Sequence, residues 1–202
     1  MSSPTPNLSF SKACENNKAP ILSIIQPLFT GTETVLEVGS GTGQHALYFA
    51  ENMPHLTWQC SDQPIYLPDI RTRLRQSKLT NTPAPLELNL FENQWPDINI
   101  DAVFCANAVH IMPWKGVEIL FSSVGKALSP GGQLVLYGPF NYSGQYTSES
   151  NRKFDQWLKV QQPESAIRDF EAINKLAVEA GLTLIKDYEM PANNRILHWI
   201  KA

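Results

Sequence analysis

The sequence has little cysteine, little net charge and no long apolar run, and each shortage excludes a class of protein. Its 202 residues include three cysteines, and none lies at the spacing of a zinc site or a disulfide framework. Lys and Arg total 16 against 19 Asp and Glu, so no strongly basic face is expected for nucleic acid. No apolar stretch approaches the roughly 20 residues of a membrane span, and residues 1–7 lack a signal-type apolar core. We therefore expect a cytoplasmic protein with no metal centre and no nucleic acid or membrane partner.

The composition is that of an ordinary globular domain. Hydrophobic residues make up 43% of the chain and charged residues 17%, a balance that argues against a disordered or fibrous protein. A chain of this length buries about 70% of its surface on folding, so it needs no disulfide or metal for stability. We expect one domain over residues 1–202, with a helical segment, residues 1–30, as a lid. A monomer and a homodimer are both compatible with this composition.

Apolar runs alternate with helical patterns along the chain, which is typical of an α/β fold. The predicted strands cover residues 34–38, 56–61, 85–90, 101–106, 133–137, 182–189 and 195–201. The predicted helices cover residues 11–29, 44–52, 68–79, 115–128, 151–161 and 165–180. Ser165 is the expected N-cap of the last helix and Gly181 its C-terminal stop. The last two strands are joined by too short a segment for a parallel crossover, so we expect an antiparallel hairpin.

Glycines at alternate positions follow the first predicted strand. Gly39, Gly41 and Gly43 lie between that strand and a helix, and Glu37 precedes them. Glycine lets the backbone approach a ligand closely, and the helix N-terminus offers free N–H groups. The dinucleotide fingerprint needs a glycine where Gln44 stands, and the Lys-Ser or Lys-Thr of a phosphate-binding loop is missing. The pattern therefore favours a ligand whose near end is cationic or carries an amino group, such as S-adenosylmethionine.

Two further polar residues end predicted strands. Asp62 ends the second strand, about 20 residues beyond the glycines, where a carboxylate can accept both ribose hydroxyls. A capping or turn aspartate is the alternative. Asn89 ends the third strand, where its amide can meet an adenine edge, and a simple turn asparagine is the alternative there.

These features resemble the motifs of class I S-adenosylmethionine-dependent methyltransferases. The broad resemblance rests on residues 37–43, Asp62, Asn89 and residues 107–110. A narrower resemblance, to a family of small methyltransferase-like proteins of unknown function from bacteria and animals, rests on residues 10–22, 107–114, 138–142, 167–170 and 190–194. The family usually has Glu-Arg-Asn where residues 15–17 read Glu-Asn-Asn, and aspartate in place of Asn89.

The resemblance implies a Rossmann-like, doubly wound sheet of seven strands, mostly parallel with the last antiparallel, and helices on both faces. It also implies S-adenosylmethionine as cofactor and S-adenosylhomocysteine as product. The implied cofactor contacts are Glu15, Asn17, Lys18, Glu37, Gly39, Ser40, Gly41, Thr42, Gly43, His45, Asp62, Gln63, Asn89, Leu90, Asn107 and Ala108.

Polar segments follow the fourth, fifth and sixth predicted strands, at the edge where open α/β sheets bind ligands. His110 is a candidate base because imidazole titrates near neutrality, and a structural histidine is the alternative. Tyr142 and Arg168 are the other catalytic candidates. Arg168 suits a carboxylate clamp, or an internal ion pair with Asp169 or Glu171. The predicted substrate contacts are Asn141, Tyr146, Asp169, Asn193 and Asn194.

These observations predict methyl transfer from S-adenosylmethionine to an O, N or S atom of a small molecule. The alternative is a non-catalytic module that binds S-adenosyl ligands as a sensor or as a partner subunit, because a nucleotide pocket by itself implies only binding.

Overall fold

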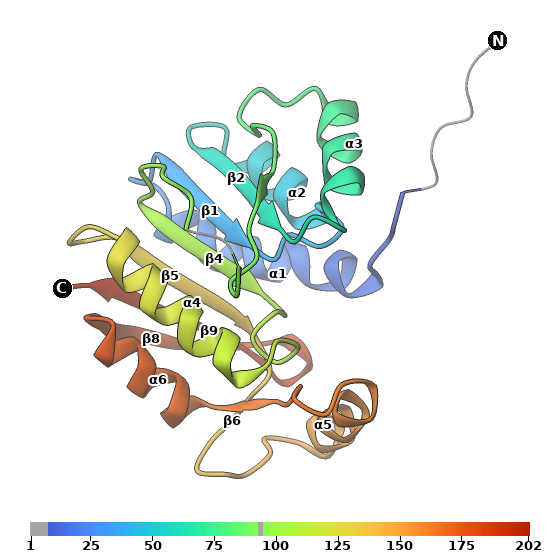
Figure 1. Ribbon diagram of the computed structural model, residues 1–202, viewed down its shortest axis with the longest axis vertical. Helices are drawn as coiled ribbons and strands as arrows, with labels where there is room; N and C mark the ends of the chain where they lie inside the picture. The colour runs from blue at the N-terminus through green and yellow to red at the C-terminus, as the bar shows by residue number, and fades with distance from the viewer. Residues whose placement is uncertain (1–7, 93–94) are drawn as a thin grey trace.

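The computed structural model describes residues 8–92 and 95–202 and places a seven-stranded sheet at their centre (Figure 1). The strand order is β3-β2-β1-β4-β5-β9-β8. The strands are β1 (Thr34–Val38), β2 (Thr57–Asp62), β3 (Leu86–Glu87), β4 (Ala102–Ala106), β5 (Gln133–Gly138), β8 (Leu182–Met190) and β9 (Asn194–Lys201). The first five are mutually parallel, and β9 is antiparallel to both β5 and β8. The predicted α/β fold and its antiparallel hairpin are confirmed.

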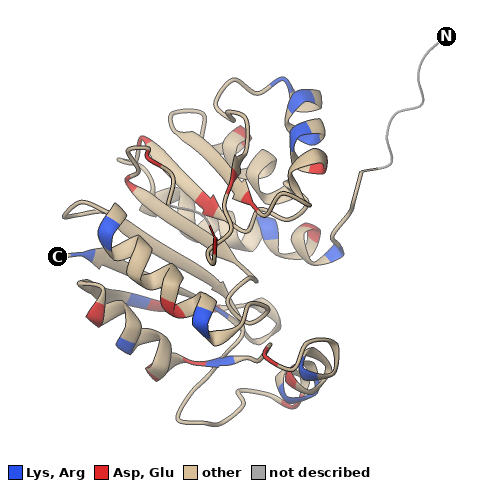
Figure 2. Ribbon diagram, in the orientation of Figure 1, with Lys and Arg blue, Asp and Glu red and all other residues tan. Residues whose placement is uncertain are grey.

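Helices cover both faces of this sheet. They are α1 (Lys12–Leu28), α2 (Gln44–Asn52), α3 (Leu67–Ser77), α4 (Trp114–Ala127), α5 (Glu149–Gln161) and α6 (Phe170–Glu179). The apolar faces of α1, α2 and α3 pack into one core and those of α4 and α6 into the other. Helix α5 stands beyond the edge where the parallel strands end (Figure 1). Lys and Arg alternate with Asp and Glu along α4 and α6 (Figure 2).

The N-terminal half of α1 lies at the edge of the sheet where the parallel strands end. Ser11 caps the helix by accepting the Cys14 N–H at 3.2 Å. Further along the helix, Ile21 and Ile25 are fully buried against the sheet, and this apolar packing holds the helix in place. No helix in the described part of the chain is both long and apolar enough to cross a membrane.

Two predicted elements differ from the structure by more than two residues at one end. The third strand, expected over residues 85–90, has only Leu86–Glu87 paired with β2, because it is an edge strand that turns away at Asn89. The helix expected over residues 165–180 begins at Phe170. Ser165 does not cap it; its hydroxyl donates to the Ile111 carbonyl at 2.5 Å instead.

The residues before α6 are extended because they pair with the loop that follows β5. Strand β7 (Arg168–Asp169) lies parallel to β6 (Phe140–Asn141) in a separate two-stranded sheet. A 3₁₀ turn, Pro191–Asn193, connects β8 to β9. These segments flank the sheet edge that carries the functional residues.

Candidate active site

The glycine loop, residues 39–43, connects β1 to α2 through left-handed backbone. Gly39, Gly41 and Gly43 have φ angles of +77°, +55° and +72°, which L side chains rarely adopt. A Cβ at Gly39 would lie 3.2 Å from the Cβ of Ala108, whereas a Cβ at Gly41 would meet nothing within 4 Å. The loop therefore packs closely against the end of β4 at Gly39 and leaves open space beside Gly41.

Asp62, at the end of β2, faces this loop. Its Oδ2 accepts the Gly41 N–H at 2.6 Å and its Oδ1 accepts the Gln63 N–H at 2.7 Å. Burial raises the pKa of Asp62, and the two N–H donors partly oppose that shift. A carboxylate has about four acceptor positions, so Asp62 retains the capacity to accept further hydroxyl groups.

Glu37 is a second buried carboxylate at this edge. Its Oε2 accepts the indole N–H of Trp58 at 3.2 Å. Burial, and to a smaller extent the nearby charge of Asp62, raise the pKa of Glu37 to about 7, although hydrogen bonds such as that from Trp58 oppose the shift. A cationic group placed beside Glu37 would favour its ionised form.

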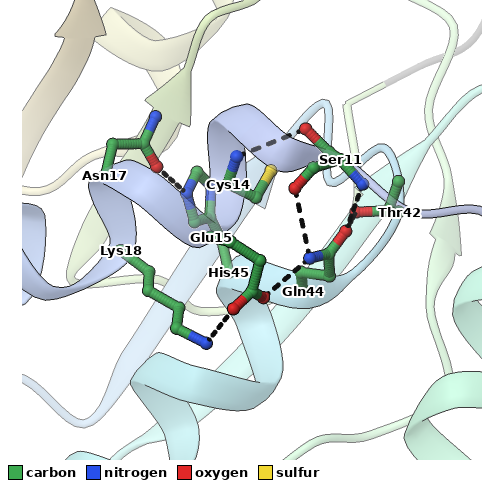
Figure 3. Close-up of polar contacts among 8 residues, drawn as sticks. All are labelled: Ser11, Cys14, Glu15, Asn17, Lys18, Thr42, Gln44 and His45. Carbon is green, nitrogen blue, oxygen red and sulfur yellow. Dashed lines mark hydrogen bonds and ion pairs between the residues drawn. The ribbon is translucent and has the colours of Figure 1, made fainter.

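Gln44 fastens α1 to the start of α2 (Figure 3). Its Oε1 accepts the Ser11 N–H at 2.6 Å and the Thr42 hydroxyl at 3.0 Å. Its Nε2 donates to Glu15 Oε1 at 2.8 Å. The residue that argues against a dinucleotide fingerprint thus holds the N-terminal helix across the glycine loop.

Three other predicted cofactor contacts join this cluster (Figure 3). Lys18 lies 2.6 Å from the Glu15 carboxylate. His45 Nε2 is hydrogen-bonded to Asn17 Oδ1 at 2.7 Å, and burial lowers the pKa of His45 to about 4. His45 is therefore neutral at physiological pH and acts in this arrangement as a link between α2 and α1.

Asn89 has the geometry of a turn residue. Its Oδ1 accepts the Phe91 N–H at 3.1 Å, and its carbonyl accepts the Glu92 N–H at 3.1 Å. The neighbouring Leu90 packs against the core beneath α4. Both residues lie next to the end of β3, near Asp62 at the end of β2.

The loop after β4 brings Asn107 and His110 beside β5. Asn107 has φ of +57°, and its N–H donates to the Tyr137 carbonyl at 2.8 Å. His110 is 3% exposed, and its Nδ1 has no hydrogen-bond partner among the described residues. A Cβ at Gly138 would lie 3.4 Å from that nitrogen and 3.8 Å from Asn107 Oδ1. An unpaired buried nitrogen is costly, so this one is a candidate contact for a ligand.

The ionisation of His110 is set by its surroundings. Burial, and next the charge of Arg168, lower the pKa of His110 to about 4. Its ring packs edge-on against Phe154 of α5, with centroids 5.5 Å apart. The imidazole is therefore neutral near pH 7. A neutral imidazole has one nitrogen that donates a hydrogen bond and one that accepts.

Arg168 holds the backbone of the His110 loop. Its Nε donates to the Val109 carbonyl at 3.1 Å, and its Nη2 donates to the backbone carbonyls of Met112 at 2.6 Å and Glu164 at 2.9 Å. Its guanidinium also lies 5.8 Å from the centre of the Trp114 ring. These contacts favour a positioning role over a carboxylate clamp.

The acidic neighbours of Arg168 bind the turn at residues 143–144 instead. Asp169 Oδ1 accepts the Gly144 N–H at 3.2 Å, and both Glu171 oxygens accept the Ser143 N–H at 3.1 Å. The two acids therefore fix the loop after β6 rather than pairing with the guanidinium.

An open cavity of about 480 Å³ lies between that loop and the tip of the β8–β9 hairpin. Its lining residues are Tyr142, Thr147, Glu189, Met190, Asn193, Asn194 and Arg195. Three of these are predicted residues: Tyr142, Asn193 and Asn194. The other three predicted substrate contacts lie outside the lining. Asp169 binds the turn at Gly144, Tyr146 donates to Asp155 at 2.7 Å, and Asn141 is buried in β6 with its Oδ1 unpartnered among the described residues.

The family comparison covers nearly the whole chain. The model for the family described as Protein of unknown function (DUF938) matches residues 8–201. This chain belongs to that family. The narrower family resemblance predicted from the sequence is thereby confirmed.

Curated proteins with methyltransferase names are similar to part of this chain. Uncharacterized methyltransferases Rv0089 of Mycobacterium tuberculosis and Mb0092 of Mycobacterium bovis are each 29% identical to it over 117 residues. Each match covers 57% of this chain and 54% of the relative, so the chain spans about half the length of the curated relatives it matches.

Solved structures share the fold of this DUF938 protein at low identity. The S-adenosylmethionine-dependent methyltransferase SibL is 21% identical with a TM-score of 0.80, covering 94% of this chain and 55% of its own. Human N-acetylserotonin methyltransferase, solved in complex with SAM, is 15% identical with a TM-score of 0.81, covering 95% and 53%. The shared fold is that of methyltransferases.

Four residues that line the cavity were not predicted from the sequence. Met190 lies within residues 190–194, which carry the family resemblance, but it was not predicted as a contact, and Thr147, Glu189 and Arg195 belong to none of the motifs above. The short hairpin connection was the available signal, because it places the start of β9 next to the end of β8, which brings Glu189 and Arg195 together.

Proposed function

We propose that this protein transfers the methyl group of S-adenosylmethionine to an O, N or S atom of a small molecule. The observation that carries the proposal is the pairing of the glycine loop with Asp62, which accepts the Gly41 N–H at 2.6 Å beside open space. The methyltransferase names of the mycobacterial relatives and of the solved proteins with this fold support it.

The residues at the glycine loop fit this cofactor. Asp62 retains acceptor positions for ribose hydroxyls, and the space beside Gly41 lets a ligand lie against bare backbone. Glu37 offers a carboxylate toward a cationic end. Asn89, Leu90, Asn107 and Ala108 border the same edge of the sheet, on the loops after β3 and β4. We assign α1, held by Gln44, to covering this site.

The protein's own contribution to the reaction is alignment and protection from water. When bound, S-adenosylmethionine supplies an electrophilic methyl group. Arg168 fixes the loop that carries His110, and neutral His110 is available to take a hydrogen bond from the acceptor's O–H or N–H. Holding the acceptor in line is a large source of rate, because correct placement can lower a barrier by roughly 7–11 kcal/mol.

Calorimetric titration with S-adenosylhomocysteine, with NADH as comparison ligand, tests the cofactor. Wild type should bind S-adenosylhomocysteine alone. Gly41→Val should bind it at least about ten-fold more weakly, because the new side chain occupies the space beside the loop. Gly131→Val is the matched control: Gly131 has φ of +85° and no atom within 4 Å, in the turn before β5.

Two results would overturn the proposal: no binding by wild type, or equal binding by wild type and Gly41→Val. Equal melting temperatures of Gly41→Val and Gly131→Val would show that the weaker binding by Gly41→Val does not come from a loss of folding. Methyl transfer to members of a small-molecule panel is expected, whereas binding without any turnover would support the sensor alternative.

A further inference from the structure

Among the residues that the structure describes, Arg195 is the one cation lining the cavity between the loop after β6 and the hairpin tip. Its Nε donates to Asp187 Oδ1 at 2.7 Å, and the side chains of both residues are about one-fifth exposed. The other oxygen of Asp187 accepts the Tyr142 hydroxyl at 2.6 Å. One edge of the guanidinium is thus fixed by a partly buried carboxylate that is itself held in place.

The second ion pair of Arg195 is of a different kind. Its Nη1 lies 3.3 Å from Glu189 Oε1, and the Glu189 side chain is 89% exposed. Such a solvated ion pair contributes little to stability, so another anion can replace Glu189 with little loss. Arg195 therefore combines a fixed orientation with an exchangeable partner, and both residues line the cavity.

The sheet register places Arg195 on the same face of the sheet as the His110 loop. Gly138 of β5 pairs with Arg195 of β9, and residues directly opposite one another in an antiparallel pair point to the same face. A Cβ at Gly138 would lie 3.4 Å from His110 Nδ1. Arg195 and the unpartnered nitrogen of His110 therefore lie on the same face, at the same edge of the sheet.

We propose that Arg195 binds a carboxylate of the methyl acceptor, so that the substrates are small organic acids. The acceptor's apolar body lies along Tyr142 and Met190, its carboxylate replaces Glu189 at Arg195, and its nucleophile is directed toward Gly138 and His110. The acceptor role rests on the proposed methyltransferase function. The cavity has the size of a small-molecule site.

The test compares an acid with its uncharged analogue. Protein with saturating S-adenosylhomocysteine is titrated with 3-hydroxybenzoate and with 3-hydroxybenzamide, followed by NMR of the arginine side-chain N–H groups. The acid should bind at least about ten-fold more tightly than the amide. Glu189→Gln should tighten acid binding about three-fold by removing the competing carboxylate, and Arg195→Gln should abolish the preference for the acid.

Glu149→Gln is the matched control, because Glu149 forms an exposed pair with Arg152 on α5 outside the cavity lining. Its acid affinity should equal that of wild type. Equal affinities of wild type for acid and amide, no saturable acid binding at tens of millimolar, or an unchanged affinity in Glu189→Gln would each overturn the assignment of Arg195.

The same titrations distinguish this inference from the proposed function. If S-adenosylhomocysteine binds and the acid shows no preference, the assignment of Arg195 fails and the cofactor proposal stands. If S-adenosylhomocysteine does not bind, the cofactor proposal fails, and the acid and amide titrations without it still report on Arg195.

Discussion

Glu37 and Asp62 are acids of similar chemistry with different hydrogen-bond donors. Asp62 accepts two backbone N–H groups, whereas the Glu37 carboxylate accepts the side-chain N–H of the Trp58 indole. Burial raises the pKa of both, and that of Glu37 reaches about 7. Glu37 is therefore a carboxylate whose charge changes near physiological pH.

Glu37→Gln should remove a pH dependence of stability. The folded-state pKa of about 7 exceeds the reference value of 4.5. The contribution of Glu37 to the stability of the folded protein is therefore fully present below pH 4.5 and is lost as pH rises through 7. Glutamine keeps an acceptor for Trp58 without the charge. We expect the variant to be more stable than wild type at pH 8 by about 1–3 kcal/mol and equally stable near pH 4.5.

Urea denaturation at the two pH values measures this difference. Glu51→Gln, at an exposed position in α2, should follow wild type at both. Parallel pH profiles for wild type and Glu37→Gln would contradict the expectation. S-adenosylhomocysteine binding by Glu37→Gln should also weaken, since the carboxylate toward the ligand's amino group is lost.

At the scale of elements, α5 is fastened by one buried carboxylate. Asp155 Oδ2 accepts the Tyr146 hydroxyl at 2.7 Å and lies 2.6 Å from Lys159, and its Oδ1 accepts the Ile167 N–H at 2.7 Å. Helix α5 is thereby joined to the loop after β6 and to the segment before β7. Phe154, next to Asp155, contacts the ring of His110.

Asp155→Asn should destabilise the protein by about 2–4 kcal/mol, because its donors lose a buried, charged acceptor. Burial opposes ionisation of Asp155, but the groups that donate hydrogen bonds to the carboxylate outweigh burial and lower the pKa of Asp155. The stability that Asp155 contributes is therefore present above the reference value of 3.8 and is lost as pH falls through the folded-state pKa. Chemical denaturation at pH 7 checks this. Glu179→Gln is the control, since Lys175 and Glu179 form an exposed pair at the same spacing, and an equal loss in both variants would refute the role of Asp155.

Helices α4 and α6 approach closely at a glycine. A Cβ at Gly125 would lie 2.5 Å from the Ala180 carbonyl oxygen and 2.8 Å from its Cβ. Gly125→Ala should lower stability by about 1–3 kcal/mol, although alanine favours a helix over glycine by about 1 kcal/mol. Thermal melting measures the change in stability of Gly125→Ala. Gly31→Ala, where a Cβ meets nothing within 4 Å, should change stability little; a stabilised Gly125→Ala would show that the helices can separate without loss.

At the scale of the whole molecule, local patterns predicted most of the fold. β1 and α2 lie at their predicted bounds, because their apolar spacing and the glycines between them are local signals. The start of α6 was wrong because β7 forms only through pairing with β6, which is distant in sequence. The glycine loop and Asp62 were predictable from spacing for the same local reason.

The contacts of individual polar side chains were not predictable in this way. Arg168 donates to carbonyls 56 and 59 residues earlier in the chain, and Gln44 binds residues 29 and 33 positions away. No spacing rule connects such partners. Arg195 is the second residue of β9 and had no predicted role, and only the register against Gly138 shows that it lies at the proposed ligand-binding edge.

The cavity and the glycine loop come from different parts of the chain. Residues 37–63 supply the loop and both carboxylates beside it, whereas the cavity lining lies within residues 142–195. Under the proposed function, substitutions in the second stretch are expected to alter which compound is methylated while the proposed donor-binding stretch is inherited unchanged. Divergence of acceptors among DUF938 proteins should accordingly concentrate in the hairpin tip and the loop facing it, and chimaeras joined within α4 should inherit their choice of acceptor from the C-terminal parent.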